Sequence, residues 1–139
     1  MMQERAMGYL SLARRGRRLE AGEEPVGALC RAGHARLVVL AEDASPHTLR
    51  RAESFVSGTQ QPLLRIPCTK EALGAAIGRS PCAIAAFTDP RLALAFVQAL
   101  EEPERCAPVL ERLTRQSDRA AQRQREERAH RRNVRHGKK

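Results

Sequence analysis

Hydrophobic positions in the first third of the chain follow first a helical period and then a strand pattern. Residues 4–15 place alanine, leucine and methionine among arginines at roughly helical spacing, and Gly16 ends the pattern. Residues 22–32 begin with two carboxylates and a proline, which suit the first turn of a helix, and Gly33 follows them. Residues 35–41 read A-R-L-V-V-L-A, a short β-branched run that is typical of a buried strand.

The same alternation continues through the second third of the chain. Residues 45–57 open with Ser-Pro and predict a helix, while residues 62–66 and 82–87 are short apolar runs that predict strands. Residues 69–76 and 90–100 each follow a capping side chain and keep helical spacing. Strands that alternate with helices predict an α/β domain, with helices on both faces of a small, largely parallel sheet.

The last third has a different composition. We expect the core to end near residue 102, because the sequence that follows consists largely of Gln, Arg, Glu and Ala. After Leu113 only alanines and one valine interrupt the polar run, so no apolar stripe can form. We predict a domain over residues 1–102 and a basic tail over residues 103–139. This tail is either a solvated single helix or a segment that orders on a polyanion, partly helical and fraying toward residues 136–139.

The charge of the chain is concentrated in this tail. The 139 residues include 25 Lys and Arg against 16 Asp and Glu, a net charge of +9. Residues 111–139 hold 11 of the cations and 4 of the anions, a net +7, which leaves +2 for the rest. A basic chain predicts a polyanionic partner. The tail would supply long-range attraction, and the nearly neutral body would select by shape or local chemistry.

Several classes of protein are excluded by composition. No apolar run approaches the roughly 20 residues of a membrane helix, and the N-terminus lacks the apolar core of a signal peptide, so we expect a cytoplasmic protein without a membrane partner. The four cysteines have no C-x-x-C pair and no neighbouring histidine pair, which predicts neither a metal site nor a disulfide framework. The length fits one domain, and we expect a monomer.

Catalytic motifs and base-stacking platforms are also missing from the sequence. There is no glycine-rich phosphate cradle with its lysine and no G-x-S-x-G elbow, and the four histidines lack ligand or triad spacing. We therefore expect no enzyme activity and no cofactor. With one Tyr, three Phe and no Trp, the chain lacks the aromatic surface on which sheet-based single-strand binders stack bases.

Four segments together resemble a known family. They read L-S-L-A-R-R-G-R-R-L-E-A-G-E-E (10–24), A-R-L-V-V-L-A-E-D-A-S-P-H-T (35–48), T-K-E-A-L-G-A-A-I-G-R (69–79) and A-I-A-A-F-T-D (83–89). In this order they resemble the ribosomal protein L7Ae family, specifically its bacterial YlxQ-like branch, over about residues 5–100. The resemblance implies the L30e-like fold, a three-layer α/β/α sandwich around a small mixed four-stranded sheet, here followed by a basic helical C-terminal extension. It also implies non-enzymatic binding of kink-turn or other structured RNA, with ribosomal RNA as the expected partner and association with the ribosome.

The resemblance also implies where RNA would bind. In that family the RNA surface is built from the start of the second helix, the loop after the A-E-D strand and the loop after L-G-x-x-x-G. A carboxylate at a helix start can accept from the donor edge of an unpaired guanine, although it can equally serve only to complement the helix dipole. Together with the arginines of the tail, the candidate RNA-binding residues are Gly22, Glu23, Glu24, Arg31, Glu42, Asp43, Arg79, Ser80, Pro81, Arg112, Arg115, Arg119 and Arg123.

One of these segments departs from the family pattern. Kink-turn binders commonly carry G-x-N-E-x-x-K at the second helix, whereas this chain has Glu24, Pro25 and Ala28 at the Asn, Glu and Lys positions. Two of the three expected contacts are missing, and Arg31 is one turn beyond the lysine position. Two alternatives follow: a protein-interaction adaptor, or the RNA-recognition subunit of an RNA-modifying enzyme. For the tail, the alternative to RNA contact is a solvated helix, but nine of its eleven cations are arginine, which suits phosphate.

Overall fold

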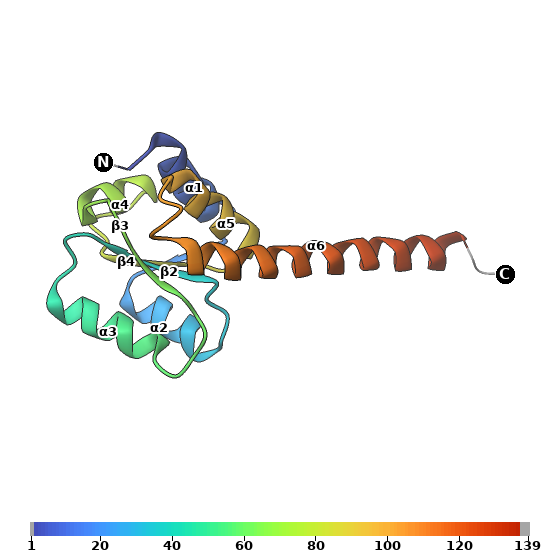
Figure 1. The fold of residues 1–139 in the computed structure, drawn as a ribbon, viewed down its shortest axis with the longest axis horizontal. Helices are drawn as coiled ribbons and strands as arrows, with labels where there is room; N and C mark the ends of the chain where they lie inside the picture. Colours follow the sequence, from blue (N-terminus) through green and yellow to red (C-terminus); the bar gives the residue numbers. More distant parts are fainter. Residues whose placement is uncertain (1, 137–139) are drawn as a thin grey trace.

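The fold is taken from a computed structural model that describes residues 2–136 (Figure 1). Helices and strands alternate along the chain, as the hydrophobic pattern predicts. In chain order the elements are α1 (Glu4–Arg15), β1 (Leu19–Ala21), α2 (Glu23–Arg31), β2 (Leu37–Ala41), α3 (Pro46–Val56), β3 (Leu63–Ile66), α4 (Lys70–Ala76), β4 (Ile84–Phe87), α5 (Pro90–Leu100) and α6 (Ala107–His136).

The four strands form one mixed sheet in the order β1-β4-β2-β3. Only β2 and β3 are parallel, and β4 runs antiparallel to both of its neighbours. The expectation of a largely parallel sheet is therefore wrong, and the mixed sheet implied by the family resemblance is confirmed. The reason lies in α4, whose seven residues span only about 10 Å. That length does not return the chain to the far end of the sheet, so β4 starts at the end where β3 stops.

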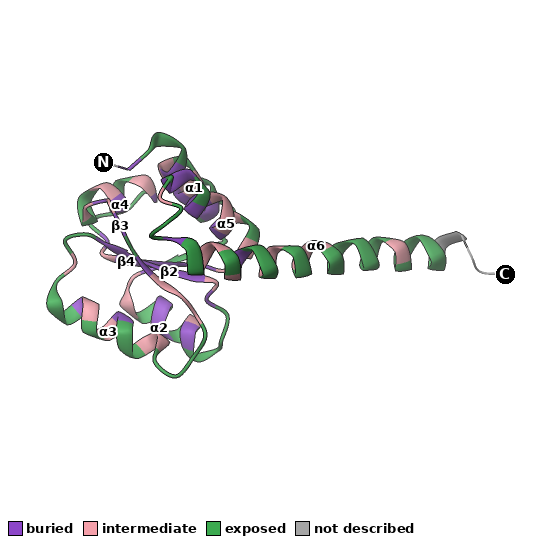
Figure 2. Cartoon of the chain, in the orientation of Figure 1, coloured by how far each residue is buried: buried purple, intermediate pink, exposed green. Residues whose placement is uncertain are grey.

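Helices cover both faces of the sheet and make a three-layer α/β/α sandwich (Figure 1). Every residue of β2 is buried (Figure 2). Its side chains alternate between two hydrophobic clusters. Val38 and Leu40 face the cluster with α2 and α3, while Leu37 and Val39 face the larger cluster with α1, α4 and α5. The continuous apolar run in this strand is thus explained by burial on both faces.

The helix starts use the capping chemistry that the sequence predicts. The hydroxyl oxygen of Ser45 accepts from the backbone N–H of Thr48 at 3.1 Å at the start of α3. Thr69 does the same for Ala72 at the start of α4, also at 3.1 Å. Each bond satisfies a backbone donor that has no partner within its own helix. Both helices therefore begin where the sequence places them.

The last helix, α6, has an anchored start and a solvated remainder. Cys106 and Leu113 have no exposed surface and belong to the larger cluster, so the core continues beyond residue 102, where the sequence pattern placed its end. Farther along, α6 projects from the body as a single helix (Figures 1 and 2). Its 30 residues correspond to about 45 Å. The expected fraying concerns mainly residues 137–139, which lie outside the described residues.

Membrane and metal signatures can be checked over the same part of the chain. Among the helices of residues 2–136, none combines the length and apolar character that crossing a bilayer requires. Over those residues no three His, Cys, Asp or Glu side chains are grouped so that they could hold a metal ion. The four cysteines are buried and unpaired with one another.

Candidate nucleic-acid interface

Three of the segments named by the resemblance meet at one end of the sheet, the left-hand end in Figure 1. Hydrogen bonds across the strand ends hold them there. The backbone N–H of Gly22 donates to the Ile84 carbonyl at 3.0 Å, and that of Glu42 donates to the Cys68 carbonyl at 2.9 Å. The structure thus brings the start of α2, the β2–α3 loop and the α4–β4 loop together. We call this area the sheet-end surface; its candidates are Gly22, Glu24, Glu42, Arg79, Ser80 and Pro81.

Arg79 lies against the start of α2. Its Nη1 atom donates to the carbonyl oxygen of Ala21 at 3.2 Å. The next residue, Gly22, has φ +101°, a conformation that favours glycine, and a Cβ there would stand 3.7 Å from the same guanidinium atom. A guanidinium beside a helix N-terminus combines a full positive charge with unpaired backbone N–H groups. This arrangement can bind a phosphate.

The two adjacent glutamates at this helix start have different surroundings. Glu23 is engaged inside the chain: its carboxylate accepts from the Thr48 hydroxyl at 3.0 Å and lies 3.4 Å from Nε of Arg51, which ties α2 to α3. Glu24 is exposed, and no hydrogen bond or ion pair joins its carboxylate to any other described residue. Of the two, Glu24 is the carboxylate that a base could reach.

The two acidic residues after β2 are both exposed, but only Asp43 is hydrogen-bonded to another part of the chain. Asp43 accepts from the backbone N–H of Lys70 at 2.8 Å and so caps the start of α4. Glu42 is exposed and lines a cavity between α1 and α4 together with Cys68 and Thr69. Asp43 therefore helps to hold the β2–α3 loop against the start of α4, while Glu42 lies on the α1 side of the sheet-end surface.

The α4–β4 loop is held in place by a glycine of the L-G-x-x-I-G segment. The backbone N–H of Arg79 donates to the Gly74 carbonyl at 2.9 Å. A Cβ on Gly74 would lie 2.9 Å from the carbonyl carbon of Ser80 and 3.0 Å from Cα of Pro81, closer than real Cβ contacts. Glycine is thus required for the loop to approach the helix. Arg79, Ser80 and Pro81 are all exposed as a result.

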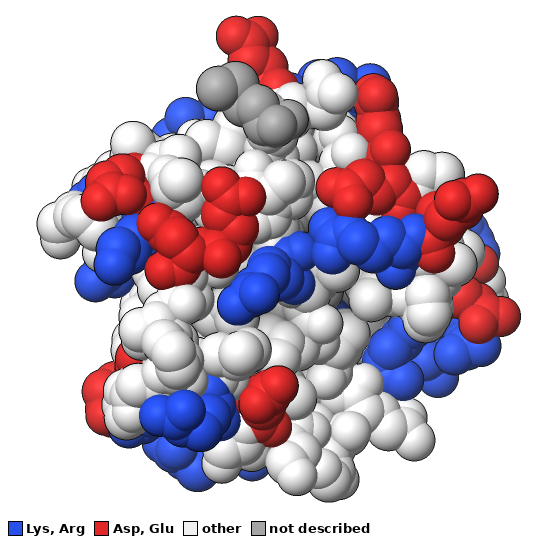
Figure 3. Space-filling view, turned by 60° about the vertical axis from the view of Figure 1, so that its left-hand side comes forward, with Lys and Arg blue, Asp and Glu red and all other residues white. Residues whose placement is uncertain are grey.

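Charges of both signs cover this end of the molecule. Figure 3 brings the left-hand end of Figure 1 forward and shows Asp and Glu groups interspersed with Lys and Arg groups. A surface of this kind does not act by charge alone. Its selectivity has to come from the placement of a few groups, as the near-neutral net charge of the body indicates.

The tail arginines and Arg31 lie at the opposite end of the sheet. Arg31 ends α2, and it lines a cavity of about 310 Å³ near the start of β2, together with Arg36, Gln60 and Arg112. Both terminal nitrogens of Arg112 lie 3.4 Å from the amide oxygen of Gln60. The predicted residues therefore form two groups, not one. Figure 1 shows the separation: α6 leaves the body on the side away from the β2–α3 loop.

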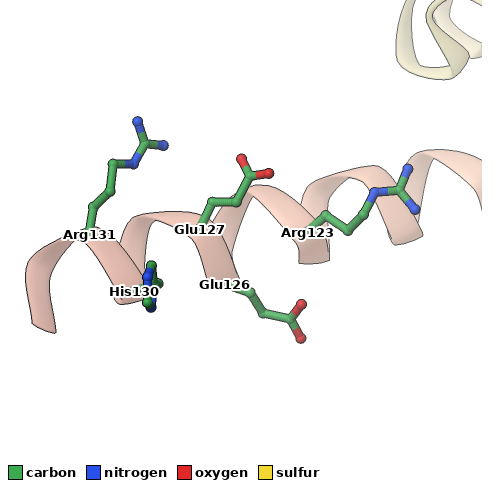
Figure 4. A pocket seen from close by; sticks show the side chains of 5 residues that line it. All are labelled: Arg123, Glu126, Glu127, His130 and Arg131. Carbon is green, nitrogen blue, oxygen red and sulfur yellow. The ribbon is translucent and has the colours of Figure 1, made fainter. Parts of the chain in front are cut away.

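Residues on the exposed part of α6 do not make a site of their own. Arg115 lies 4.0 Å from Glu111 one turn away, an exposed pair that contributes little to stability. Farther out, the side chains of Arg123, Glu126 and Glu127 border an open hollow with His130 and Arg131. Figure 4 shows these side chains spreading around one helix without converging on a common point.

The thiol of Cys68 is buried beneath the sheet-end surface and is a weaker nucleophile than an ordinary cysteine. Burial, together with the neighbouring carboxylates of Glu42 and Asp43, raises the pKa of Cys68 to about 11. At pH 8 the thiolate fraction is then far below that of an ordinary cysteine.

We expect alkylation of Cys68 by iodoacetamide to be at least tenfold slower in the native protein than after denaturation. Peptide-resolved mass spectrometry at pH 8 measures both rates, and equal rates would contradict the expectation.

Comparisons with known proteins agree with this architecture. The family described as "Ribosomal protein L7Ae/L30e/S12e/Gadd45 family" matches residues 4–96. The RNA-binding protein YlxQ of Bacillus subtilis is 30% identical over 92 residues, which cover 66% of this chain and 91% of that protein. A Bacillus halodurans protein of unknown function superposes with a TM-score of 0.65 and 27% identity, covering 72% of this chain and 100% of the other.

A more distant solved structure shows the same fold. The 15.5kD RNA binding protein of Giardia lamblia has a TM-score of 0.57 and 21% identity, and the superposition covers 70% of this chain and 83% of the other. The resemblance seen in the four sequence segments is therefore confirmed. The chain belongs to the ribosomal protein L7Ae/L30e/S12e/Gadd45 family, in its YlxQ-like branch.

Proposed function

We propose that this protein binds structured RNA through the sheet-end surface and performs no catalysis itself. The observation that carries the proposal is the position of Arg79, whose guanidinium lies beside the start of α2, the same helix start that carries the exposed Glu24. Membership of the family and the similarity to an RNA-binding protein support the same function. Ribosomal RNA is the proposed source of the bound element.

Each group on this surface has a separate task in the proposed complex. The guanidinium of Arg79 and the N–H groups at the start of α2 hold a backbone phosphate, which positions the RNA without reading its sequence. The Glu24 carboxylate accepts from the N–H donors of a guanine that is unpaired or in a sheared pair. Gly22 keeps the approach open, because a side chain there would stand against Arg79.

The range of RNA structures should be wider than that of kink-turn binders. Pro25 and Ala28 are exposed at positions where those binders carry contact residues, and neither side chain can hydrogen-bond. Fewer base contacts mean less discrimination between RNA structures, while phosphate contacts keep the overall affinity. We therefore propose a preference for kink-turn-like elements that is real but modest.

Two substitutions on the full-length protein test this assignment. Arg79→Gln should weaken binding to a kink-turn hairpin and to a plain hairpin alike, and it should reduce the slope of log affinity against log salt by about one. Glu24→Gln should instead narrow the affinity ratio between the two RNAs by roughly tenfold, since one base contact is worth about 1–3 kcal/mol. Fluorescence anisotropy over a range of salt concentrations measures both effects.

Matched controls separate these effects from a change in net charge. Arg65→Gln removes an exposed cation from the edge strand β3, and Glu104→Gln removes an exposed carboxylate from the α5–α6 connector. Neither should change the ratio between the two RNAs. The proposed function fails if the unaltered protein binds neither RNA above non-specific levels at low salt. A pull-down partner that persists after nuclease treatment would favour the adaptor instead.

A further inference from the structure

A basic surface, distinct from the sheet-end surface, lies where α6 leaves the body. A cavity of about 250 Å³ is lined by Arg36, Pro90, Gln116, Arg119 and Arg123, so three of its five lining residues are arginines and none is acidic. Two carboxylates neighbour the lining residues in sequence. Asp89 is engaged, because it accepts from the backbone N–H of Arg91 at 2.9 Å and lies 3.5 Å from Arg18. Asp118, next to Arg119, is exposed and does not line the cavity. We call this cavity the arginine groove.

The arginine groove has walls from both the body and the helix. Arg36 precedes β2, and its backbone N–H donates to the Phe87 carbonyl at 2.8 Å, which fixes its position in the sheet. Arg119 and Arg123 are one turn apart and share a face of α6. A hydrogen bond of 2.8 Å from Nη1 of Arg91 to the amide oxygen of Gln124 ties α5 to α6 just beyond them. Arg36 from just before β2 and Arg119 and Arg123 from α6 therefore line one cavity.

Unpartnered polar atoms gather at the same junction. Within the described residues, the buried side-chain nitrogen and oxygen atoms that lack a hydrogen-bond partner are Nε of Arg36, Nε of Arg112 and the amide oxygen of Gln116. Arg36 and Gln116 line the arginine groove, and Arg112 lines the neighbouring cavity with both of them. Two of these three atoms are arginine donors, and an anionic ligand at the junction would supply the acceptor that each of them lacks.

The size and charge of the arginine groove fit a phosphate better than a larger ligand. Its volume is below the roughly 300–1,000 Å³ of small-molecule sites, so a nucleotide or cofactor would not be enclosed. Arginine presents a planar set of donors that matches phosphate oxygens in pairs. Three such groups on two elements suit consecutive phosphates of a nucleic-acid backbone.

We propose that the arginine groove binds the phosphate backbone of a second RNA segment. This inference rests on the proposed function, because it takes the partner at the sheet-end surface to be RNA. The arginine groove lies near the start of β2, whereas the sheet-end surface lies beyond the end of β2. A single RNA segment therefore cannot contact both surfaces unless it passes around the body. One chain then holds two RNA segments, or two parts of a folded RNA, on opposite sides of the body.

A two-step capture experiment with the full-length protein tests this inference. A plain RNA hairpin on beads is saturated with the protein, and a second, fluorescent hairpin is then added. The unaltered protein should retain the second hairpin. The double variant Arg119→Gln/Arg123→Gln should retain at most a tenth as much, and its salt slope should fall by about two, one for each lost phosphate contact. Arg36→Gln should reduce retention as well, although it leaves α6 unchanged.

The outer part of α6 offers a control with the same charge and spacing. Arg128→Gln/Arg132→Gln removes two exposed arginines four residues apart on the same helix, and glutamine keeps the helix propensity close to that of arginine. Equal losses for the two double variants would overturn the inference, because the tail would then act by charge alone. Unchanged retention in the groove variant would also overturn it, because the second hairpin would then be held elsewhere on the chain. If the unaltered protein binds no hairpin at all, the proposed function fails first.

Discussion

Replacing Leu113 with alanine should lower the free energy of unfolding by about 2–5 kcal/mol. Leu113 has no exposed surface and lies in the larger hydrophobic cluster, although it belongs to the otherwise polar helix α6. The substitution removes apolar atoms and leaves a cavity, since the surrounding side chains relax only in part. It also loosens the start of α6, so both the body and the projecting helix depend on this side chain.

Denaturant unfolding followed by circular dichroism measures this effect. Leu12→Ala is the matched control, because Leu12 is 47% exposed on α1 and its truncation removes the same atoms from the surface. The control should change the unfolding free energy by less than about 1 kcal/mol. A similar cost for both variants would show that Leu113 is not part of the core. A chain that ends at Pro108 lacks this anchor and should be less stable for the same reason.

Replacing Gly74 with alanine should disturb the sheet-end surface at a distance from any RNA contact. The added Cβ meets the backbone of Ser80 and Pro81, and backbone atoms cannot move aside as a flexible side chain can. Overpacking of this kind costs about 1–3 kcal/mol, which exceeds the roughly 1 kcal/mol gained from the better helix propensity of alanine. The loop that carries Arg79 then shifts, and RNA affinity should fall at least tenfold with it.

Gly8→Ala separates this steric effect from helix propensity. Gly8 lies in α1, and nothing stands within 4 Å of the position its Cβ would take. Alanine there should stabilise the protein by about 0.5–1 kcal/mol and leave RNA affinity unchanged. We expect the free energy of unfolding to rise in Gly8→Ala and to fall in Gly74→Ala. RNA affinity should fall in Gly74→Ala only. Unchanged affinity in Gly74→Ala would contradict the role given to the α4–β4 loop.

Most of the fold follows from the hydrophobic pattern, and what does not follow has a physical reason. The five helices of the body and the strands β2, β3 and β4 are found within a few residues of the predicted ranges. Strand β1 was not predicted, because three residues are too few to show a period and its partner β4 is more than 60 residues away. The direction of β4 follows from the short length of α4. The apolar pattern of a strand does not indicate whether the strand runs parallel or antiparallel to its neighbours.

The candidate site was predictable in position more than in detail. The family resemblance names the segments that meet at the sheet end, but burial and hydrogen bonding then divide their residues. Glu23 and Asp43 accept hydrogen bonds from other parts of the chain, and Arg79 donates one to Ala21, whereas the carboxylate of the exposed Glu24 makes none with the described residues. Sequence reasoning missed Arg36, whose only signal is a single cation ahead of the run that forms β2. Nothing in the tail sequence shows that Arg119 lines the same cavity as Arg36, because the position of α6 depends on how Leu113 packs into the core.

The solvated outer part of α6 has a consequence for how this chain can evolve. Beyond Leu113 its residues are half-buried or exposed up to position 134, so packing does not fix their identity. Mutations there are free to accumulate as long as helix propensity and positive charge persist. Homologues should therefore conserve the composition and length of the part of α6 beyond Leu113, while the residue at each position varies. Alignments of the family would then lose register at the point where the helix leaves the body.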